Sequence, residues 1–234
     1  MYSGNTIAIL LPARNEAEAL PAVLSHMPAL VDVVVVIDNG SNDSTAEVAQ
    51  SYGVRVVSES KPGYGKACLA GIEALQNNPP DIIAFADADG SDDLSRLPEI
   101  IDPLVKEHAD LVIEKRLPIE PDALSQQQRF GNWLATTLIR LFWGHAFQDL
   151  GPMRAMRWGS LQNMDMKDQD FGWTIEMQIK AVKTGLRIVE VPLPYMKRTA
   201  GTSKISRTIK GSICAGIKII WVIFREALMR RQTA

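Results

Sequence analysis

Two aspartates separated by one residue are the side chains best suited to chemistry. Asp87 and Asp89 flank Ala88 directly after the apolar run 82–86. At the end of a strand, residues two positions apart point to the same side, so both carboxylates face one ligand. Carboxylate oxygens suit Mg²⁺ or Mn²⁺, which would bridge a diphosphate and neutralise its leaving charge, and Ser91 could add a hydroxyl ligand. The alternative is a solvated acidic loop that caps the following helix.

Polar side chains also follow two other apolar runs. Asp38 and Asn39 come after the second run, where a carboxylate and an amide could read a base edge or a ribose; an ordinary Asn-Gly turn is the alternative. The loop 61–66 carries Lys61 and Gly65 ahead of a helical stretch, and glycines beside a helix N-terminus suit a phosphate. The spacing is not that of a P-loop. No GxGxxG follows a strand, which argues against a dinucleotide cofactor.

The apolar runs and the stretches between them indicate the fold class. The runs are rich in Ile and Val without clean alternation, as in strands that are buried on both faces. Strands that alternate with helices predict an α/β fold with a doubly wound, mainly parallel sheet and helices on both faces. Ligands bind such a sheet at the carboxyl ends of its strands. The expected strands span 6–11, 33–37, 54–58, 82–86 and 111–113, and the expected helices span 16–26, 44–51, 65–76 and 94–107.

The second half of the chain is less regular. We expect the chain to divide into one domain, 1–205, and a C-terminal helix, 206–234. Prolines directly after the last expected strand should end it. The expected elements are helices at 126–142 and 174–184, a strand at 187–191 ended by Pro192 and Pro194, and a mobile loop at 199–203.

The C-terminal helix is expected to be basic and amphipathic. Apolar residues recur at three- and four-residue spacing, with Lys210, Lys218 and Arg225 beside the stripe. Such a helix can lie in a membrane interface and attract anionic lipid. Packing on its own domain, or on a second subunit in a homo-oligomer, is the alternative, because apolar stripes at helical spacing belong more often to a core.

Composition excludes several classes of protein. The chain has 234 residues and a formal net charge of −2, so bulk charge does not indicate a nucleic-acid partner. Cys68 and Cys214 are too few and too far apart for a disulfide framework or a zinc site. No signal peptide and no run of about 18 apolar residues is readable. The expected location is cytoplasmic, with peripheral contact on the inner face of the membrane.

Taken in order, these segments resemble the family 2 inverting glycosyltransferases, the group that includes the polyprenyl (dolichyl) phosphate mannose and glucose synthases. The resemblance covers residues 6–205 and implies the nucleotide-diphospho-sugar transferase fold, called GT-A. Two departures leave the base and the acceptor open: Asn39 replaces the second Asp of the common DDGS tetrad, and the DxSGFR-like segment lacks its Ser and Phe. The matching segments are 11–16 (LPARNE), 37–45 (IDNGSNDST), 61–66 (KPGYGK), 87–89 (DAD), Arg116, 149–154 (DLGPMR), 172–177 (GWTIEM) and 198–204 (RTAGTSK).

The resemblance also implies substrates and roles. The donor is expected to be a UDP-, GDP- or dTDP-hexose, and the cofactor Mg²⁺ or Mn²⁺. A lipid-phosphate acceptor is already anionic and needs cationic positioning, whereas a hydroxyl acceptor needs a carboxylate base, for which Asp149 and Glu176 are the candidates. The expected site residues are catalytic (Asp149, Glu176, Arg116), donor-binding (Pro12, Arg14, Glu16, Asp38, Asn39, Lys61, Gly65, Asp87, Ala88), acceptor-binding (Arg116, Arg129, Arg198, Lys204) and metal-binding (Asp87, Asp89, Ser91).

Two other classes share parts of this pattern. A sugar nucleotidyltransferase has the same fold, but it needs a GxGTR-type glycine loop where this chain has PARNE at 12–16. A non-catalytic nucleotide-binding module would bind nucleotide without turnover. The paired carboxylates and their cationic partners argue against that module.

Overall fold

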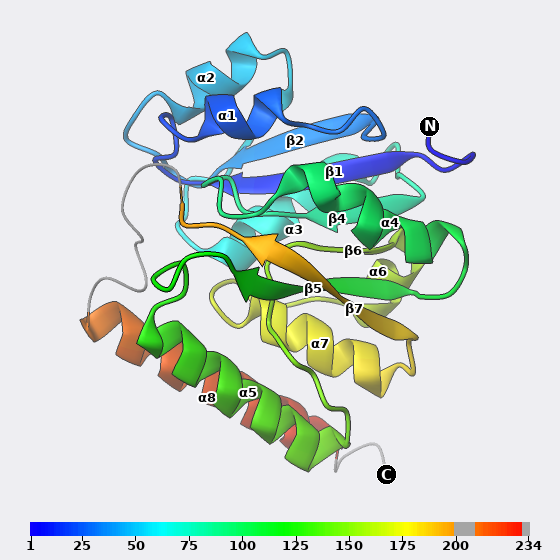
Figure 1. Ribbon diagram of the computed structural model, residues 1–234, viewed down its shortest axis with the longest axis vertical. Coiled ribbons are helices and arrows are strands. Elements are labelled where there is room, and N and C mark those ends of the chain that lie inside the picture. Colours follow the sequence, from blue (N-terminus) through cyan, green and yellow to red (C-terminus); the bar gives the residue numbers. More distant parts are fainter. Residues whose placement is uncertain (199–208, 231–234) are drawn as a thin grey trace.

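The computed structural model describes residues 1–198 and 209–230, apart from the side chains of 209–215 and 229–230. Within them, strands form one sheet with helices on both faces (Figure 1). Lys204 and the loop 199–203 lie outside the described residues. The strands are β1 (Ile7–Ala13), β2 (Val33–Asp38), β3 (Arg55–Ser58), β4 (Ile82–Phe85), β5 (Leu111–Pro118), β6 (Arg154–Arg157) and β7 (Ile188–Tyr195). The helices are α1 (Leu20–Ser25), α2 (Thr45–Ser51), α3 (Tyr64–Leu75), the 3-10 helix η1 (Leu94–Arg96), α4 (Leu97–Val105), α5 (Gln126–Trp143), α6 (Trp158–Met164), α7 (Trp173–Lys183) and α8 (Ile209–Arg230).

The strand order is β3-β2-β1-β4-β6-β5-β7. β1 pairs in parallel with β2 and β4, β2 with β3, and β5 with β7, whereas β6 runs antiparallel between β4 and β5. The other six strands therefore run in one direction and end at the same edge. This confirms the predicted doubly wound, mainly parallel sheet. β6 was not predicted, because its four residues include Arg154 and Arg157 and give no apolar run.

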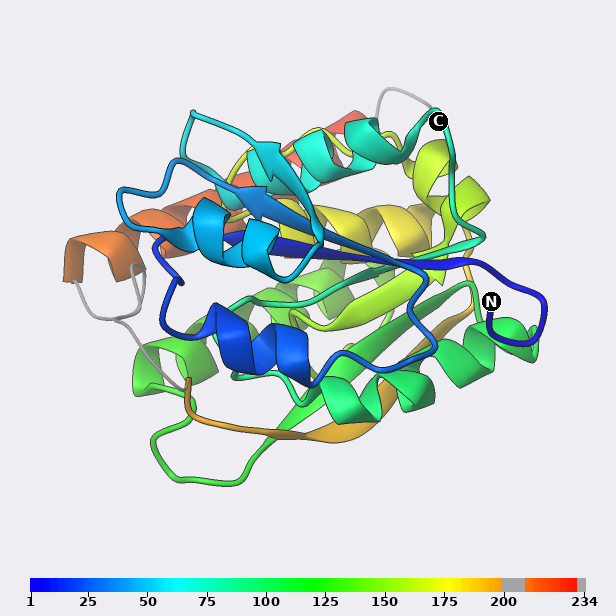
Figure 2. The same ribbon diagram turned by 90° about the horizontal axis from the view of Figure 1, so that it is seen from above.

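Side chains of each central strand alternate between two hydrophobic cores. Ile7, Ile9 and Leu11 of β1 pack with residues of α1, α2 and α4, whereas Ala8 and Leu10 pack with residues of α3, α5, α6, α7 and α8. Figure 2 shows the two helical layers on opposite sides of the sheet. Because both faces are covered, these strands are continuously apolar, which is why the sequence shows them so clearly.

The last strand extends beyond its predicted end. β7 runs through Pro192 and Pro194 to Tyr195, with Pro192 opposite Lys115 and Pro194 opposite Leu117. The expectation that the prolines end this strand was wrong. β7 lies at the edge of the sheet, and prolines two positions apart direct their missing N–H groups to the same side of the strand. An edge strand has a side without a neighbour, so no ladder hydrogen bond is lost there.

The first helix begins later than predicted. The expected start was residue 16, but α1 begins at Leu20, and the residues before it form a loop. The backbone N–H of Glu16 donates to Thr45 Oγ1 at 2.9 Å, and the backbone N–H of Asn15 donates to Ser41 Oγ at 2.9 Å. These bonds connect the loop after β1 to the loop after β2 and to the start of α2. Glu16 therefore lies in a strand-end loop, where a ligand-binding residue is expected.

Helix α8 packs on its own chain, against α5 and α7 (Figure 1). Val222 and Ile223 are fully buried in the core, and the Phe142 and Phe224 rings meet edge to face at 5.7 Å. Of the three interpretations of the apolar stripe, this agrees with packing of the helix on its own domain. Among the described residues, none of the helices has both the length and the apolarity needed to cross a bilayer.

Candidate active site

Loops that follow three different strands meet at Arg198. Arg198 comes after β7, and its Nη2 lies 2.9 Å from Glu16 Oε1, after β1, and 2.9 Å from Asp89 Oδ2, after β4. The guanidinium therefore stands between two carboxylates that are far apart in sequence. The carboxyl edge of the sheet brings these three predicted site residues together.

The loop after β4 is held by hydrogen bonds to its own carboxylates. Asp89 Oδ1 accepts from the backbone N–H of Ser91 at 2.9 Å and from the Ser91 hydroxyl at 2.6 Å. Asp92 Oδ2 accepts from the backbone N–H of Asp87 at 2.8 Å, and Ala88 is buried between the two candidate metal ligands. The Ser91 hydroxyl thus orients Asp89, while its oxygen keeps lone pairs for a ligand.

Negative charge accumulates around Asp87. Burial and the neighbouring Asp89 carboxylate raise the pKa of Asp87 to about 7, and burial together with the Glu114 carboxylate raises the pKa of Asp92. A bound cation would stabilise such a group of carboxylates. Among the described residues, no group of three or more His, Cys, Asp or Glu side chains is arranged to hold a metal ion by itself. Asp87, Asp89 and the Ser91 hydroxyl offer hard oxygen ligands, a donor set that fits Mg²⁺ or Mn²⁺ held together with substrate phosphates.

The end of β2 and the residue after it carry two polar side chains, Asp38 and Asn39, with different contacts. Asp38 Oδ1 accepts from the backbone N–H of Ser41 at 3.0 Å and is partly exposed. The Asn39 side chain is buried: its Nδ2 donates to the Glu59 and Lys61 carbonyls at 3.2 and 2.9 Å, and its Oδ1 accepts from the Gly63 N–H at 2.8 Å. Asn39 therefore shapes the loop 61–66, and the exposed Lys61 side chain extends from that loop.

The glycines of this loop are required by the chain itself. A Cβ on Gly63, whose φ is +152°, would lie 2.3 Å from the Gln169 carbonyl oxygen. A Cβ on Gly65 would lie 2.1 Å from the Asp168 carbonyl oxygen, and the Lys66 N–H donates to Gln169 O at 3.0 Å. Glycine here lets two backbone segments meet. Packing within the chain thus already requires glycine at position 65, and the predicted approach of a ligand to Gly65 stays a prediction.

The end of β1 contributes two further predicted donor-site residues. Pro12 is partly exposed and pairs in register with Ile37, one residue before Asp38. Arg14 is half-buried, and its Nε is buried without a hydrogen-bond partner among the described residues. A buried guanidinium N–H without a partner favours a bound anion at this position.

Arg116 and Asp149 form a bidentate ion pair. Arg116 Nε and Nη2 donate to different Asp149 oxygens at 2.8 Å each, and the Arg116 backbone N–H donates at 2.8 Å. The Leu150 N–H supplies a fourth bond at 2.8 Å, so the four lone-pair positions of the carboxylate are all occupied. The Arg116 guanidinium also lies 5.2 Å from the centre of the Tyr195 ring. Three guanidinium N–H groups are not used by Asp149 and can bind an anion.

The second predicted acceptor arginine lies in the first turns of α5. The exposed Arg129 donates from Nε to the Leu124 carbonyl and from Nη2 to the Pro121 carbonyl, both at 3.2 Å. These bonds fix the loop between β5 and α5, which follows the strand that carries Arg116. Helix α5 begins at this loop with a capping box between Ser125 and Gln128.

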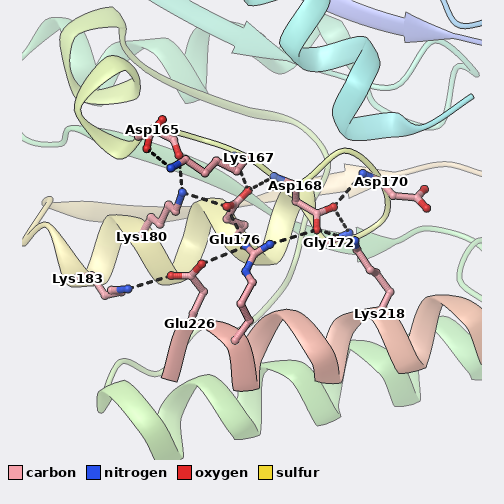
Figure 3. Close-up of polar contacts among 11 residues, drawn as sticks. Asp165, Lys167, Asp168, Asp170, Gly172, Glu176, Lys180, Lys183, Lys218 and Glu226 are labelled. Atoms are coloured by element: carbon pink, nitrogen blue, oxygen red, sulfur yellow. Dashed lines mark hydrogen bonds and ion pairs between the residues drawn. The ribbon is translucent and has the colours of Figure 1, made fainter. Parts of the chain in front are cut away.

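The other predicted catalytic acid, Glu176, is fully buried at the start of α7 (Figure 3). Its Oε2 accepts from the backbone N–H groups of Lys167 and Asp168 at 3.0 and 2.6 Å, and its Oε1 lies 3.0 Å from Lys180 Nζ and 2.9 Å from Arg225 Nη2. Among the described residues, these partners come from α7, α8 and the segment 165–172. The structure thus places Glu176 between helices, and it too has four partners.

Glu114 is a buried acid near the site that the sequence did not single out. Glu114 of β5 is 0% exposed; its Oε2 accepts from the Met153 N–H at 3.4 Å, and its Oε1 has no hydrogen-bond partner among the described residues. Burial, with Asp149 and Asp87 nearby, raises the pKa of Glu114 to about 8. One signal in the sequence could have identified it: Glu114 directly follows the apolar run 111–113, like the predicted site residues that follow other strands. The strand was instead expected to end at residue 113.

The chain is similar in sequence to several known proteins. The sequence profile of glycosyl transferase family 2 matches residues 8–163. An uncharacterized glycosyltransferase of Mycobacterium tuberculosis is 38% identical over 213 residues, which cover 91% of this chain and 95% of the relative. A dolichyl-phosphate hexose transferase of Haloferax volcanii is 29% identical over 232 residues, which cover 97% of this chain and 98% of the relative.

The fold is shared with a solved enzyme structure. Glucosyl-3-phosphoglycerate synthase from Mycobacterium tuberculosis, in complex with Mn²⁺, uridine-diphosphate and glucosyl-3-phosphoglycerate, has a TM-score of 0.77 at 24% identity. The match covers 96% of this chain and 81% of that chain. The likeness confirms the predicted GT-A fold.

Proposed function

Because the chain belongs to glycosyl transferase family 2, and is therefore a glycosyltransferase, we propose that it moves a hexose from a nucleotide-diphosphate sugar onto a polyprenyl phosphate. The donor is a UDP-, GDP- or dTDP-hexose. The acceptor oxygen attacks the anomeric carbon from the face opposite the diphosphate, so the configuration inverts.

The two predicted catalytic carboxylates already have a full set of hydrogen-bond and ion-pair partners, which supports a phosphate acceptor. Asp149 and Glu176 each have four hydrogen-bond or ion-pair partners, so neither has a free lone pair for a proton from an attacking hydroxyl. A phosphate oxygen is anionic near pH 7 and attacks without a base. The Haloferax relative, a dolichyl-phosphate hexose transferase by name, supports the same acceptor class.

Cationic groups then position the acceptor. Arg116 is held rigidly by Asp149 and keeps three N–H groups for a phosphate, which two of them can bind as a fork. Arg129 and Arg198 add charge from the adjoining loops, and Lys204 is proposed to join them. Holding the phosphate close to the anomeric carbon removes much of the entropic part of the barrier.

The donor occupies the edge formed by the loops after β1, β2 and β4. Asp87 and Asp89, with Ser91, would hold Mg²⁺ or Mn²⁺, which supplies positive charge that stabilises the diphosphate as leaving group. Asp38 binds the base or ribose, and the Arg14 Nε that lacks a partner binds a phosphate oxygen. The other residues proposed to line the donor site are Pro12, Glu16, Asn39, Lys61, Gly65 and Ala88.

A lipid acceptor requires contact with a membrane, and the outer face of α5 and α8 is suited to it. Large apolar side chains are exposed there, among them Trp133 (59%), Leu141 (75%) and Trp221 (51%). Aromatic and aliphatic side chains with neighbouring cations are typical of helices that lie in a membrane interface. We therefore propose peripheral attachment at the cytoplasmic face. The exposed members of this apolar surface are Phe130, Trp133, Leu141, Ile217, Ile220, Trp221, Phe224 and Leu228.

The test is release of nucleoside diphosphate from a panel of UDP-, GDP- and dTDP-hexoses. Each donor is assayed with Mn²⁺, Mg²⁺ or EDTA, and with or without polyprenyl phosphate. The negative control is Asp89→Asn, and the matched control is Glu47→Gln, an exposed carboxylate on α2. We expect release from one donor only, and only with both metal and lipid phosphate present. Asp89→Asn should lose this activity, and Glu47→Gln should keep it.

Other outcomes would contradict parts of the proposal. Metal-dependent release that requires a hydroxyl acceptor, such as a sugar or phosphoglycerate, would exclude the lipid-phosphate acceptor. Nucleotide binding without turnover on any acceptor would favour a non-catalytic binding module.

A further inference from the structure

The segment 165–172, between α6 and α7, is organised around one buried carboxylate. Asp168 is 2% exposed, and its Oδ1 accepts from the backbone N–H groups of Asp170 and Gly172 at 2.9 and 3.1 Å (Figure 3). Its backbone N–H donates to Glu176 Oε2 at 2.6 Å. The Asp168 side chain therefore shapes this turn and connects it to the start of α7.

The backbone of the same residue supports the loop 61–66. The Asp168 carbonyl oxygen lies only 2.1 Å from the position that a Cβ on Gly65 would take, and the Gln169 carbonyl accepts from the Lys66 N–H at 3.0 Å. The first turn of α3 and the glycine loop before it therefore rest on the turn that Asp168 shapes. A displacement of this turn displaces the loop.

Helix α8 reaches Asp168 from the opposite side. Lys218 Nζ lies 3.0 Å from Asp168 Oδ2, and Arg225 Nη1 lies 4.0 Å from the same oxygen. Both cations also lie over the Trp221 ring, at 4.9 and 5.0 Å from its centre, and Trp221 belongs to the exposed apolar surface. The contacts thus run from that surface, through two cations, to Asp168.

Such a contact is energetically consequential because the Asp168 side chain is buried. A buried carboxylate that loses its cation is left charged in a medium of low dielectric, and the surrounding structure must rearrange or admit water. The segments closest to the lost charge are the turn 165–172 and the loop 61–66, which contacts it. Exposed ion pairs such as Lys167–Asp165, with side chains 66% and 72% exposed, carry no such penalty.

We propose that Asp168 is a positioning residue through which α8 holds the loop 61–66 in the shape that binds the donor. The inference rests on the proposed function in one respect, that this loop belongs to the donor site. The ion pair with Lys218 keeps the turn against Gly63 and Gly65. Loss of the pair loosens the loop without altering any group at the reacting atoms.

The test compares Asp168→Asn and Lys218→Met with the wild-type enzyme. Asn keeps an oxygen for the two N–H groups of the turn but removes the charge, and Met keeps the apolar stem of Lys218. Both substitutions should raise the KM for the nucleotide-sugar about 10-fold and leave kcat within about twofold. The double variant should be no worse than either single variant, and Lys218→Arg should restore the wild-type KM.

Two controls separate positioning from general destabilisation. Asp165→Asn removes a nearby but exposed carboxylate and should leave the KM unchanged. Asp110→Asn breaks the pair with Arg187 and should lower the midpoint of thermal unfolding without raising the donor KM. A raised KM in Asp110→Asn would assign the effect of Asp168→Asn to lost stability and overturn the proposal.

Hydrogen exchange tests the link independently of turnover. The backbone amides of Lys61 and of residues 63–66 should exchange about 10-fold faster in Asp168→Asn than in wild type, and no faster in Asp165→Asn. If the wild-type protein released no nucleotide, the proposed function would fail, whereas this exchange result would still decide whether Asp168 holds the loop. Equal exchange in wild type and Asp168→Asn, or an unchanged KM, would overturn the inference.

Discussion

Arg116 and Asp149 form a two-pronged pair in which Nε and Nη2 of the guanidinium each lie 2.8 Å from a different carboxylate oxygen. The sequence suggested Asp149 as a base and Arg116 as a phosphate ligand, as separate functions. In the structure the two residues act on each other. The Asp149 carboxylate fixes the orientation of the Arg116 guanidinium, and the guanidinium uses lone pairs of the carboxylate that a base would need. A bidentate pair of this kind has one orientation, which favours recognition of a second anion by the remaining N–H groups.

Asp149→Asn should therefore lower kcat/KM for the acceptor by about 10- to 100-fold, because Arg116 loses its fixed orientation. The dependence of kcat on pH should keep its shape, since the carboxylate does not accept the acceptor proton. Steady-state kinetics from pH 5 to 9 would measure both, with Asp122→Asn as an exposed control. Loss of the acidic limb of the profile in Asp149→Asn would instead identify Asp149 as a general base.

Arg198→Gln should strengthen Mn²⁺ binding measured without nucleotide. Arg198 Nη2 lies 2.9 Å from Asp89, so its charge competes with a metal ion for that carboxylate. Electron paramagnetic resonance of free Mn²⁺ should show affinity about 3- to 10-fold higher in Arg198→Gln and close to wild type in Arg198→Lys. Equal affinity in wild type and Arg198→Gln would show that the arginine does not compete.

Asn39→Asp should destabilise the protein, although the common family tetrad carries Asp at this position. The Asn39 amide donates to the Glu59 and Lys61 carbonyls, and a carboxylate cannot donate to either. Two buried acceptors would then face a charge, at a cost of about 1–3 kcal/mol in the free energy of unfolding. Urea unfolding at pH 7 measures the difference, with Asp38→Asn as the neighbouring control. Unchanged stability would mean that the loop re-forms with other donors.

Glu114→Gln should change how stability depends on pH. Burial raises the pKa of Glu114 to about 8, so between pH 4.5 and 8 the folded protein holds a proton that the unfolded chain has lost. The stability from protonated Glu114 is thus complete below about pH 4.5 and is lost as pH rises toward 8.

Gln cannot ionise, so this loss disappears in the variant. Relative to wild type, Glu114→Gln should gain roughly 2–5 kcal/mol between pH 4.5 and pH 8.5 in urea unfolding without metal. Parallel stability curves for the two proteins would show that Glu114 does not titrate in this range.

The exposed face of α5 should govern attachment to lipid. Replacing Trp133 and Leu141 together by Gln should weaken binding to vesicles of anionic phospholipid by about 10-fold or more, because two large apolar groups no longer leave water. Tyr52→Ser, an exposed aromatic at the end of α2, is the control. Sedimentation with vesicles measures binding. Unaltered binding, with a smaller molecular mass in solution for the double variant, would assign this face to a second copy of the chain.

Local pattern was sufficient for much of the fold. Strands buried on both faces are apolar over several residues, so β1, β2 and β4 were visible as runs of Ile, Val and Leu. Polar residues at or just after the strand ends, Asp38 and Asp87, identified the edge where the candidate site lies. That edge follows from the parallel direction of the strands alone.

The sequence by itself thus determined most of the sheet, the edge where the candidate site lies and the family, because these depend on residue type and short spacing. Tertiary structure decided what each polar side chain contacts. Arg116 meets Asp149 across 33 positions, and Arg198 meets Glu16 across 182. In the sequence Asp168 looks like an ordinary loop aspartate. Only in the fold does it contact both Lys218 of α8 and Gly65 of the loop 61–66. Whether a carboxylate is free to react depends on such distant partners, which no local pattern encodes.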